Sequence, residues 1–187
     1  STTMFTGFNT QSNSVQRRDG SGPKQSTTMT RANAMDHIKK HFDVAGTWEQ
    51  KTENGMTMVT TSTWGFDGRG LFSTEGMRLP DGSIVETGES AMWWDGLTSS
   101  FRTHYLNNVG IVVMGEVTSF TVDGDTTTMV VMTTGSNAAE QAITAAMTQV
   151  LKGETLTVTF SDMRVNGRPM TPKWAEKPMV TRRVSKN

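Results

Sequence analysis

Tight-turn dipeptides recur at short intervals along the chain from Asn54 onward. Asparagine-glycine and aspartate-glycine pairs favour two-residue hairpin turns, because both residues tolerate a positive φ. The segments between these turns are rich in Thr, Val, Met and aromatic residues, and each is long enough for one strand. The pattern therefore predicts consecutive antiparallel hairpins. The turn signals are Asn54-Gly55, Asp67-Gly68, Asp81-Gly82, Asp95-Gly96, Asn107-Asn108, Asp123-Gly124, Lys152-Gly153 and Asn166-Gly167.

The expected strands follow one another through short connections. Sequential antiparallel neighbours are the simplest topology for such strands, and closing the sheet on itself removes its exposed edges. We predict an all-β fold, an antiparallel up-and-down β-barrel with a short N-terminal helix and an extended N-terminal tail. Residues 137–151 are ambiguous, and we expect a short turn of helix followed by a strand. The clearer strands are 46–53, 56–65, 70–79, 83–94, 98–106, 109–121 and 125–134.

Composition argues against several functional classes. The 187 residues include 18 basic and 18 acidic ones, so the chain has no overall field to attract a nucleic acid or an anionic membrane. Cysteine is absent, which rules out disulfides and thiolate chemistry. No apolar run is long enough to span a bilayer. The chain begins at Ser1 without a methionine, which processing during export or organelle import would explain, as would an expression boundary.

Residues 1–32 form a low-complexity arm before the predicted barrel domain of residues 33–187. Ser, Thr, Gln, Asn and Gly dominate this arm, so we expect it to be disordered on its own. The alternative is an arm that becomes ordered on a protein partner, with a small apolar anchor followed by basic residues. The partner-contact candidates in the arm are Met4, Phe5, Phe8, Arg17 and Arg18.

A short amphipathic helix is expected after Asn33, with Ile38 and Phe42 on its apolar face. His37 and His41 lie four residues apart on this helix, and that spacing suits a pair of metal ligands. No third ligand is evident in the sequence. We therefore expect two solvated histidines and no metal site.

The first and last expected strands carry a recognisable pair of features. Gly46-Thr47-Trp48 opens the first strand, and the last strand contains Arg182 and Arg183. This arrangement resembles the calycin superfamily of lipocalins, fatty-acid-binding proteins and related barrels, in which a late arginine lies across the tryptophan of Gly-x-Trp. The pattern is most similar to uncharacterised bacterial calycin-like proteins. The resemblance implies that Trp48 and either Arg182 or Arg183 close one barrel end, and we take Arg182 as the partner.

The predicted barrel interior is rich in methionine and aromatic side chains. The chain has 14 Met, 8 Phe and 5 Trp residues, which form an adaptable lining for an irregular apolar ligand. A small barrel can also be filled by its own side chains, and this alternative stays open. Arg102 would contact the head group of a ligand if it pointed inward. The ligand-lining candidates are Met58, Trp64, Met77, Phe101, Arg102 and Tyr105.

The sequence carries no catalytic signature. Glu75, Glu86 and Glu89 lie in early strands and could act with His104 as a general acid or base, but nothing in the sequence fixes their separation. We therefore assign no catalytic residues and expect no cofactor. A role other than catalysis is favoured.

Two functions are consistent with these patterns. The first is a non-catalytic binding protein that holds a small apolar or amphipathic ligand in a barrel cavity. The second is an accessory subunit of a larger assembly, docking through its N-terminal arm and the proline-containing loop of residues 166–178. Trp174 in this loop is the remaining partner-contact candidate.

Overall fold

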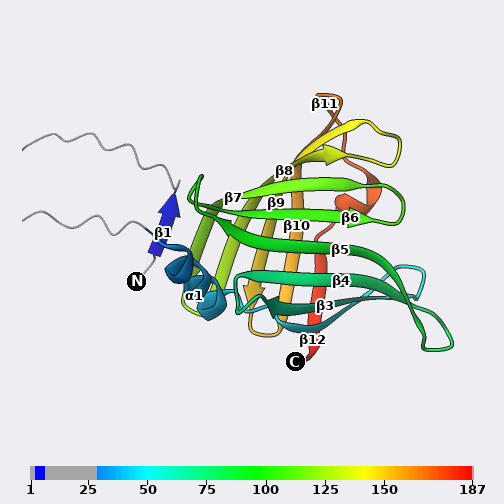
Figure 1. Cartoon of the computed structure of the whole chain (residues 1–187). Coiled ribbons are helices and arrows are strands. Elements are labelled where there is room, and N and C mark those ends of the chain that lie inside the picture. The colour runs from blue at the N-terminus through cyan, green and yellow to red at the C-terminus, as the bar shows by residue number, and fades with distance from the viewer. Residues whose placement is uncertain (1–2, 7–28, 187) are drawn as a thin grey trace, which may run out of the picture.

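The strands of the chain form one closed antiparallel barrel (Figure 1). The structure is a computed structural model and describes residues 3–6 and 29–186. The barrel strands are β2 (Gly46–Lys51), β3 (Thr57–Gly65), β4 (Gly70–Arg78), β5 (Ile84–Asp95), β6 (Ser100–Asn107), β7 (Val112–Asp123), β8 (Thr126–Ser136), β9 (Ala142–Lys152), β10 (Thr155–Val165) and β12 (Met179–Ser185). Each pairs with its neighbours in sequence, β12 pairs with β10 and β2, and β7 pairs with both β6 and β8. The predicted all-β up-and-down fold is confirmed.

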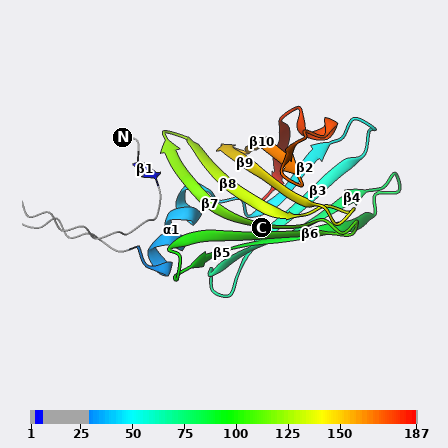
Figure 2. The same ribbon diagram turned by 90° about the horizontal axis from the view of Figure 1, so that it is seen from above.

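Short elements accompany the barrel. They are β1 (Thr3–Thr6), α1 (Arg31–His41), β11 (Arg168–Pro169) and the 3-10 helix η1 (Lys173–Ala175). Figures 1 and 2 place α1 at one end of the barrel. Within residues 3–6 and 29–186, neither helix is long or apolar enough to cross a membrane.

Two of the predicted turns, Asp67-Gly68 and Asn166-Gly167, have a positive φ at both residues, whereas Asp95-Gly96 has a positive φ at neither. Asn166 and Gly167 join β10 to β11 with φ values of +50° and +77°. A two-residue type I′ turn requires a positive φ at both central positions, which asparagine and glycine tolerate best. Local turn chemistry therefore sets the antiparallel pairing of these strands.

The ambiguous segment of residues 137–151 contains a turn and a strand, and the expected turn of helix is wrong. The Asn137 side-chain oxygen accepts hydrogen bonds from the backbone N–H groups of Ala139 and Gln141, at 3.0 and 2.9 Å. An asparagine side chain that satisfies nearby backbone groups in this way stabilises a turn at the expense of a helix. Strand β9 follows and pairs with β8 and β10 along its length.

Helix α1 begins earlier than expected and packs against the barrel. Thr30, not Asn33, is its N-cap, because the Thr30 hydroxyl accepts a hydrogen bond from the Asn33 backbone N–H at 3.2 Å. Ala34 and Ile38 are fully buried in the core, which fixes the orientation of the helix. At the other end of the helix, the Thr127 hydroxyl of β8 donates to the His41 carbonyl at 2.6 Å. One end of the barrel is thereby covered by α1.

Strand β1 extends the sheet along β7. Its residues Thr3–Thr6 pair with residues 119–122 of β7, whereas β6 pairs with residues 112–116. β1 therefore continues the pairing of β7 where β6 has ended, and it satisfies an edge that would otherwise be exposed.

Candidate functional site

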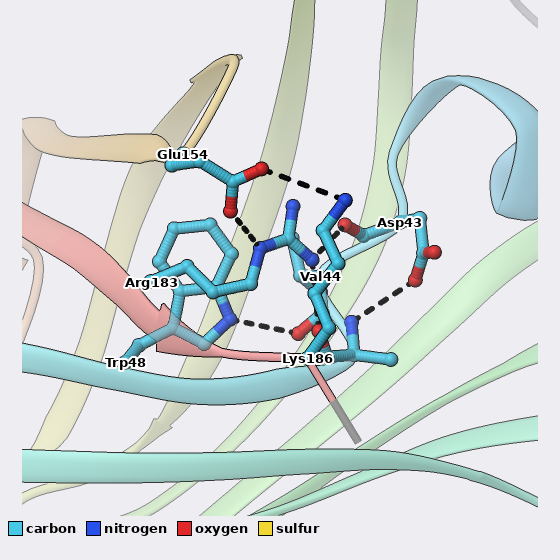
Figure 3. Close-up of polar contacts among 7 residues, drawn as sticks. Asp43, Val44, Trp48, Glu154, Arg183 and Lys186 are labelled. Carbon is cyan, nitrogen blue, oxygen red and sulfur yellow. Dashed lines mark hydrogen bonds and ion pairs between the residues drawn. The ribbon is translucent and has the colours of Figure 1, made fainter.

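The tryptophan that opens the first barrel strand lies beneath an arginine of the last strand (Figure 3). The Arg183 guanidinium carbon is 4.7 Å from the centre of the Trp48 ring. The choice of Arg182 as the partner is wrong. Arg183 lies opposite Trp48 in the β2–β12 register and shares its face of the sheet, whereas Arg182 lies opposite Glu49 on the other face.

Arg183 also ties together three separate segments of the chain. Its Nη1 atom donates to the backbone carbonyls of Asp43 and Ala45 at 2.9 and 2.8 Å, and its Nε atom pairs with Glu154 (Figure 3). Its side chain is only 5% exposed. The hydrogen bond from Arg183 lowers the pKa of the Glu154 carboxyl. The arginine thus joins the helix-to-barrel connection, the β9–β10 turn and β12.

The helix-covered part of the barrel, which we call the closed end, has a solid apolar core. The Trp48 indole N–H donates to the Val44 carbonyl at 2.9 Å, so its polar atom is satisfied. Trp94 and Phe101 are 3% and 2% exposed and stack edge to face, with ring centres 5.0 Å apart. The other buried strand residues of this core are Leu71, Met92, Val117, Phe120, Met129, Val131 and Leu151.

Two of the predicted lining residues belong to this closed end. Phe101 is part of the packed core just described. The Trp64 ring packs against the same core, donates its N–H to Asp43 Oδ1 at 3.3 Å and lies 5.3 Å from Lys39 Nζ of α1. Both side chains face the inside of the barrel, but they lie where α1 covers it.

The opposite part of the interior, which we call the open half, is packed less completely. Met58 lies opposite Met77, and Phe160 lies opposite Met147, whose other neighbour in register is the fully buried Val131. Opposite residues share a face, so these side chains point inward. They are only half-buried. Solvent therefore reaches inward-facing side chains in the open half.

One wall of the open half is polar. Ser62, Ser73, Ser90 and Tyr105 lie opposite one another across β3 to β6 and form a row on the inner face. Ser62 and Ser73 share a hydrogen bond of 2.6 Å. The next row toward the mouth contains Glu75 of β4, between Thr60 and Gly88.

Tyr105 and Glu75 are joined directly. The phenol donates to Glu75 Oε1 at 2.9 Å, and the Asn107 amide donates to the phenol oxygen at 3.4 Å. Burial, together with the nearby Glu75 charge, raises the pKa of Tyr105 to about 12, so the phenol remains a donor at physiological pH. The sequence predicts that Tyr105 lines the interior and that Glu75 lies in an early strand, but it does not predict this contact. It depends on pairing between strands 30 positions apart.

The prediction that Arg102 lines the barrel interior is wrong, because its side chain lies on the outer face. Its guanidinium lies 3.2 Å from Glu116 and 3.7 Å from Asp95. Phe101 and Tyr105 of the same strand face inward, and alternation therefore turns Arg102 and His104 outward. The barrel wall separates His104 from Glu75, so they do not form an acid–base pair.

Two surface hollows lie outside the barrel interior. The larger, about 410 Å³, lies on the outer face of β3 to β6 and is lined by Phe72, Glu89, Ala91 and His104, among others. The smaller, about 320 Å³, lies between α1 and the β3–β4 turn. Within the described residues, no group of three or more His, Asp or Glu side chains is placed to hold a metal.

Trp174 lies beside the open half. Its ring stacks edge to face on the inward-facing Phe160, with ring centres 5.4 Å apart, while 58% of the residue stays exposed. In Figure 1 the orange segment that contains Trp174 lies on the side of the barrel away from α1. Of the partner-contact candidates in the arm, Met4 and Phe5 lie in β1, paired with β7. Phe8, Arg17 and Arg18 lie outside the described residues.

Comparison with known proteins bears on the fold. No protein-family model matches the chain, and no curated protein matches it significantly. Among solved structures, the chain is similar to Rv2717c from M. tuberculosis, with 14% sequence identity and a TM-score of 0.55. The match covers 79% of this chain and 97% of the other. The two chains therefore share an antiparallel barrel fold, which agrees in general outline with the calycin resemblance.

Proposed function

We propose that the protein is a non-catalytic binding protein that holds a small apolar or amphipathic ligand in the open half of its barrel. The observation that carries this proposal is that the inward-facing side chains of Met58, Met77, Tyr105 and Phe160 are only half-buried. Side chains that fill a core are buried, as most of those of the closed end are. A ligand inside the barrel would contact these partly exposed side chains and bury them.

Barrel size supports the same proposal. Eight strands enclose an interior that side chains fill or that holds one small ligand, and the diameter grows with strand number. This barrel has ten strands besides β1 and β11. We extend the calycin resemblance on this basis to a calycin-like carrier, in which Trp48 and Arg183 close one end and the ligand occupies the other.

The open half has one polar and one apolar wall, and this combination suits an amphipathic ligand. The serine row and Glu75 on β3 to β6 present oxygen atoms, whereas Met147, Val158 and Phe160 of β9 and β10 present apolar groups. Such pockets combine a mostly apolar lining with a few polar groups that orient the ligand. Trp174 adds an aromatic surface beside Phe160.

A neutral fluorescent probe, N-phenyl-1-naphthylamine, tests the proposal on the purified chain. We expect saturable binding of one probe per chain, weakened at least about tenfold by Met147→Trp, which fills the interior. Met132→Trp is the matched control, because Met132 on neighbouring β8 is 47% exposed on the outer face. Absent binding, or equal weakening by both substitutions, would overturn the proposal.

The accessory-subunit alternative rests on exposed apolar side chains of the late loop. Met170 and Trp174 are 56% and 58% exposed, so two large apolar side chains of one loop face the solvent. Native mass spectrometry of protein purified from its source distinguishes the two functions. A bound small mass favours the carrier, whereas co-purifying subunits that are lost on deleting residues 1–30 favour the accessory subunit.

A further inference from the structure

The charge that faces the open half is negative. Among the described residues, the inward-facing positions of this half include one acidic side chain, Glu75, and no lysine or arginine. The ion pairs of the described residues involve other carboxylates, those of Glu49, Asp95, Glu116, Glu154 and Asp162. Glu75 therefore has no basic partner in the described part of the chain.

Glu75 is held in position but keeps one oxygen available. Oε1 accepts the hydrogen bond from Tyr105, and within the described residues no protein group donates to Oε2. Asn107 in turn donates to the Tyr105 oxygen, which fixes the phenol. The carboxylate is thus oriented by a short chain of hydrogen bonds, as groups that bind ligands commonly are.

Gly88 leaves the space in which this arrangement fits. It lies directly opposite Glu75 in the β4–β5 register. A Cβ atom at this position would lie 3.2 Å from the Tyr105 oxygen and 3.3 Å from its Cε2 atom, closer than most such contacts. The missing side chain allows the Tyr105 ring to lie across β5 and reach Glu75.

A half-buried carboxylate without a cation lacks the partner that would compensate its desolvation. A ligand carboxylate would add a like charge at this position, whereas a protonated amine would form a charge-assisted hydrogen bond to it. The chain has no net charge, so a preference for cations would arise locally at Glu75 and not from the whole molecule.

On these grounds we propose that the barrel ligand is an amphiphile with a protonated primary amine, whose head group binds Glu75 Oε2 and whose apolar part lies against Met147, Val158 and Phe160. This inference rests on the proposed carrier function and adds the chemical class of the ligand. Tyr105 acts as a positioning residue, since it orients the carboxylate through Oε1.

Three chain-matched amphiphiles test the inference at pH 7, each at concentrations below its micelle concentration or its solubility limit. Dodecylamine, dodecanol and dodecanoate each compete with N-phenyl-1-naphthylamine for the purified protein. We expect dodecylamine to displace the probe at a concentration about tenfold lower than either other compound. Glu75→Gln should abolish this preference while keeping an oxygen for the Tyr105 hydrogen bond. Glu89→Gln, an exposed glutamate on neighbouring β5, is the control and should leave the preference unchanged.

The outcomes separate this inference from the proposed function. If all three amphiphiles displace the probe equally, or the alcohol or acid is preferred, the amine assignment is wrong and the carrier function stands. If the preference persists in Glu75→Gln, the assignment to Glu75 is wrong. If the probe itself does not bind, both proposals fail. The comparison of amine with acid needs only the unsubstituted protein, so poor folding of a variant does not prevent the test.

Discussion

The two ends of the barrel differ in how completely they are packed. At the closed end, inward-facing residues such as Phe101, Phe120 and Val131 are at most 2% exposed, α1 packs against this core, and Arg183 lies over Trp48. In the open half, inward-facing Met77 and Phe160 are half-buried, and Trp174 contacts the rim. The difference indicates that strand pairing alone does not pack the interior of this barrel with side chains. The core is solid only where a helix and an arginine cover it.

The largest effect we expect is a loss of stability, and it should differ between two phenylalanine-to-alanine substitutions. Phe120 of the closed end is 2% exposed, so Phe120→Ala should lower the free energy of unfolding by about 3–5 kcal/mol. Phe160 of the open half is half-buried, so Phe160→Ala should cost about 1–2 kcal/mol, since less packing is lost. Urea denaturation followed by circular dichroism measures both. Equal losses would show that the open half is packed as tightly as the closed end.

A second comparison concerns the two adjacent arginines of β12. Arg183→Ala should lower the free energy of unfolding by about 2–4 kcal/mol, because two backbone carbonyls and the Trp48 face lose a nearly buried partner. Arg182→Ala is the matched control and should change it by less than about 0.5 kcal/mol, since that residue is exposed. If Arg182→Ala lowered the free energy of unfolding more than Arg183→Ala, it would argue against the stabilising role assigned to Arg183.

Much of this fold is predictable from local sequence signals. Turn pairs such as Asn166-Gly167 act through the φ values of their own residues, so they can be recognised without the partner strands. The calycin resemblance places Trp48 at a barrel end, where the structure has it. The structure of residues 137–141 is harder to predict from sequence, because the Asn137 side chain stabilises a turn that propensity alone assigns to a helix.

The site depends on register, which local signals do not fix. Arg182 and Arg183 are adjacent and chemically identical, and only the pairing of β12 with β2 decides which lies over Trp48. Register also brings Tyr105 to Glu75 and turns Arg102 to the outside, toward Glu116. Alternation within β6 could have placed Arg102 outward, because Phe101 and Tyr105 have the stronger tendency to be buried.

A third prediction concerns Trp174, which lies at the rim of the open half beside Phe160. Trp174→Ala should lower the free energy of unfolding by only about 1 kcal/mol, because the residue is 58% exposed, but it should weaken binding of N-phenyl-1-naphthylamine. Phe66→Ala is the control, since Phe66 is 75% exposed and also stacks on an aromatic ring, that of Phe72, away from the open half. Binding that Phe66→Ala weakens as much as Trp174→Ala would contradict a role for the rim.

The smallest effect we expect is a pH dependence of the closed end. Burial lowers the pKa of His37 below its ordinary value of 6.5, and the charges of His41 and Lys40 lower it further. The ring of His37 lies 5.3 Å from that of Phe120, so protonation places a charge beside the apolar core.

Because the pKa of His37 is lower in the folded state, the unfolded chain binds more protons between the two values, and stability rises with pH. The contribution of neutral His37 to the free energy of unfolding is complete above its ordinary pKa of 6.5. It decreases as the pH falls toward the pKa of His37 in the folded state. Urea denaturation from pH 5 to 8 should show this decrease, and His37→Gln should reduce it. His104→Gln removes a histidine from the outer wall and should leave the decrease intact. If His37→Gln has no effect on the pH profile, protonation of His37 does not lower the free energy of unfolding. The contact of the His37 ring with Phe120 then does not make stability depend on pH.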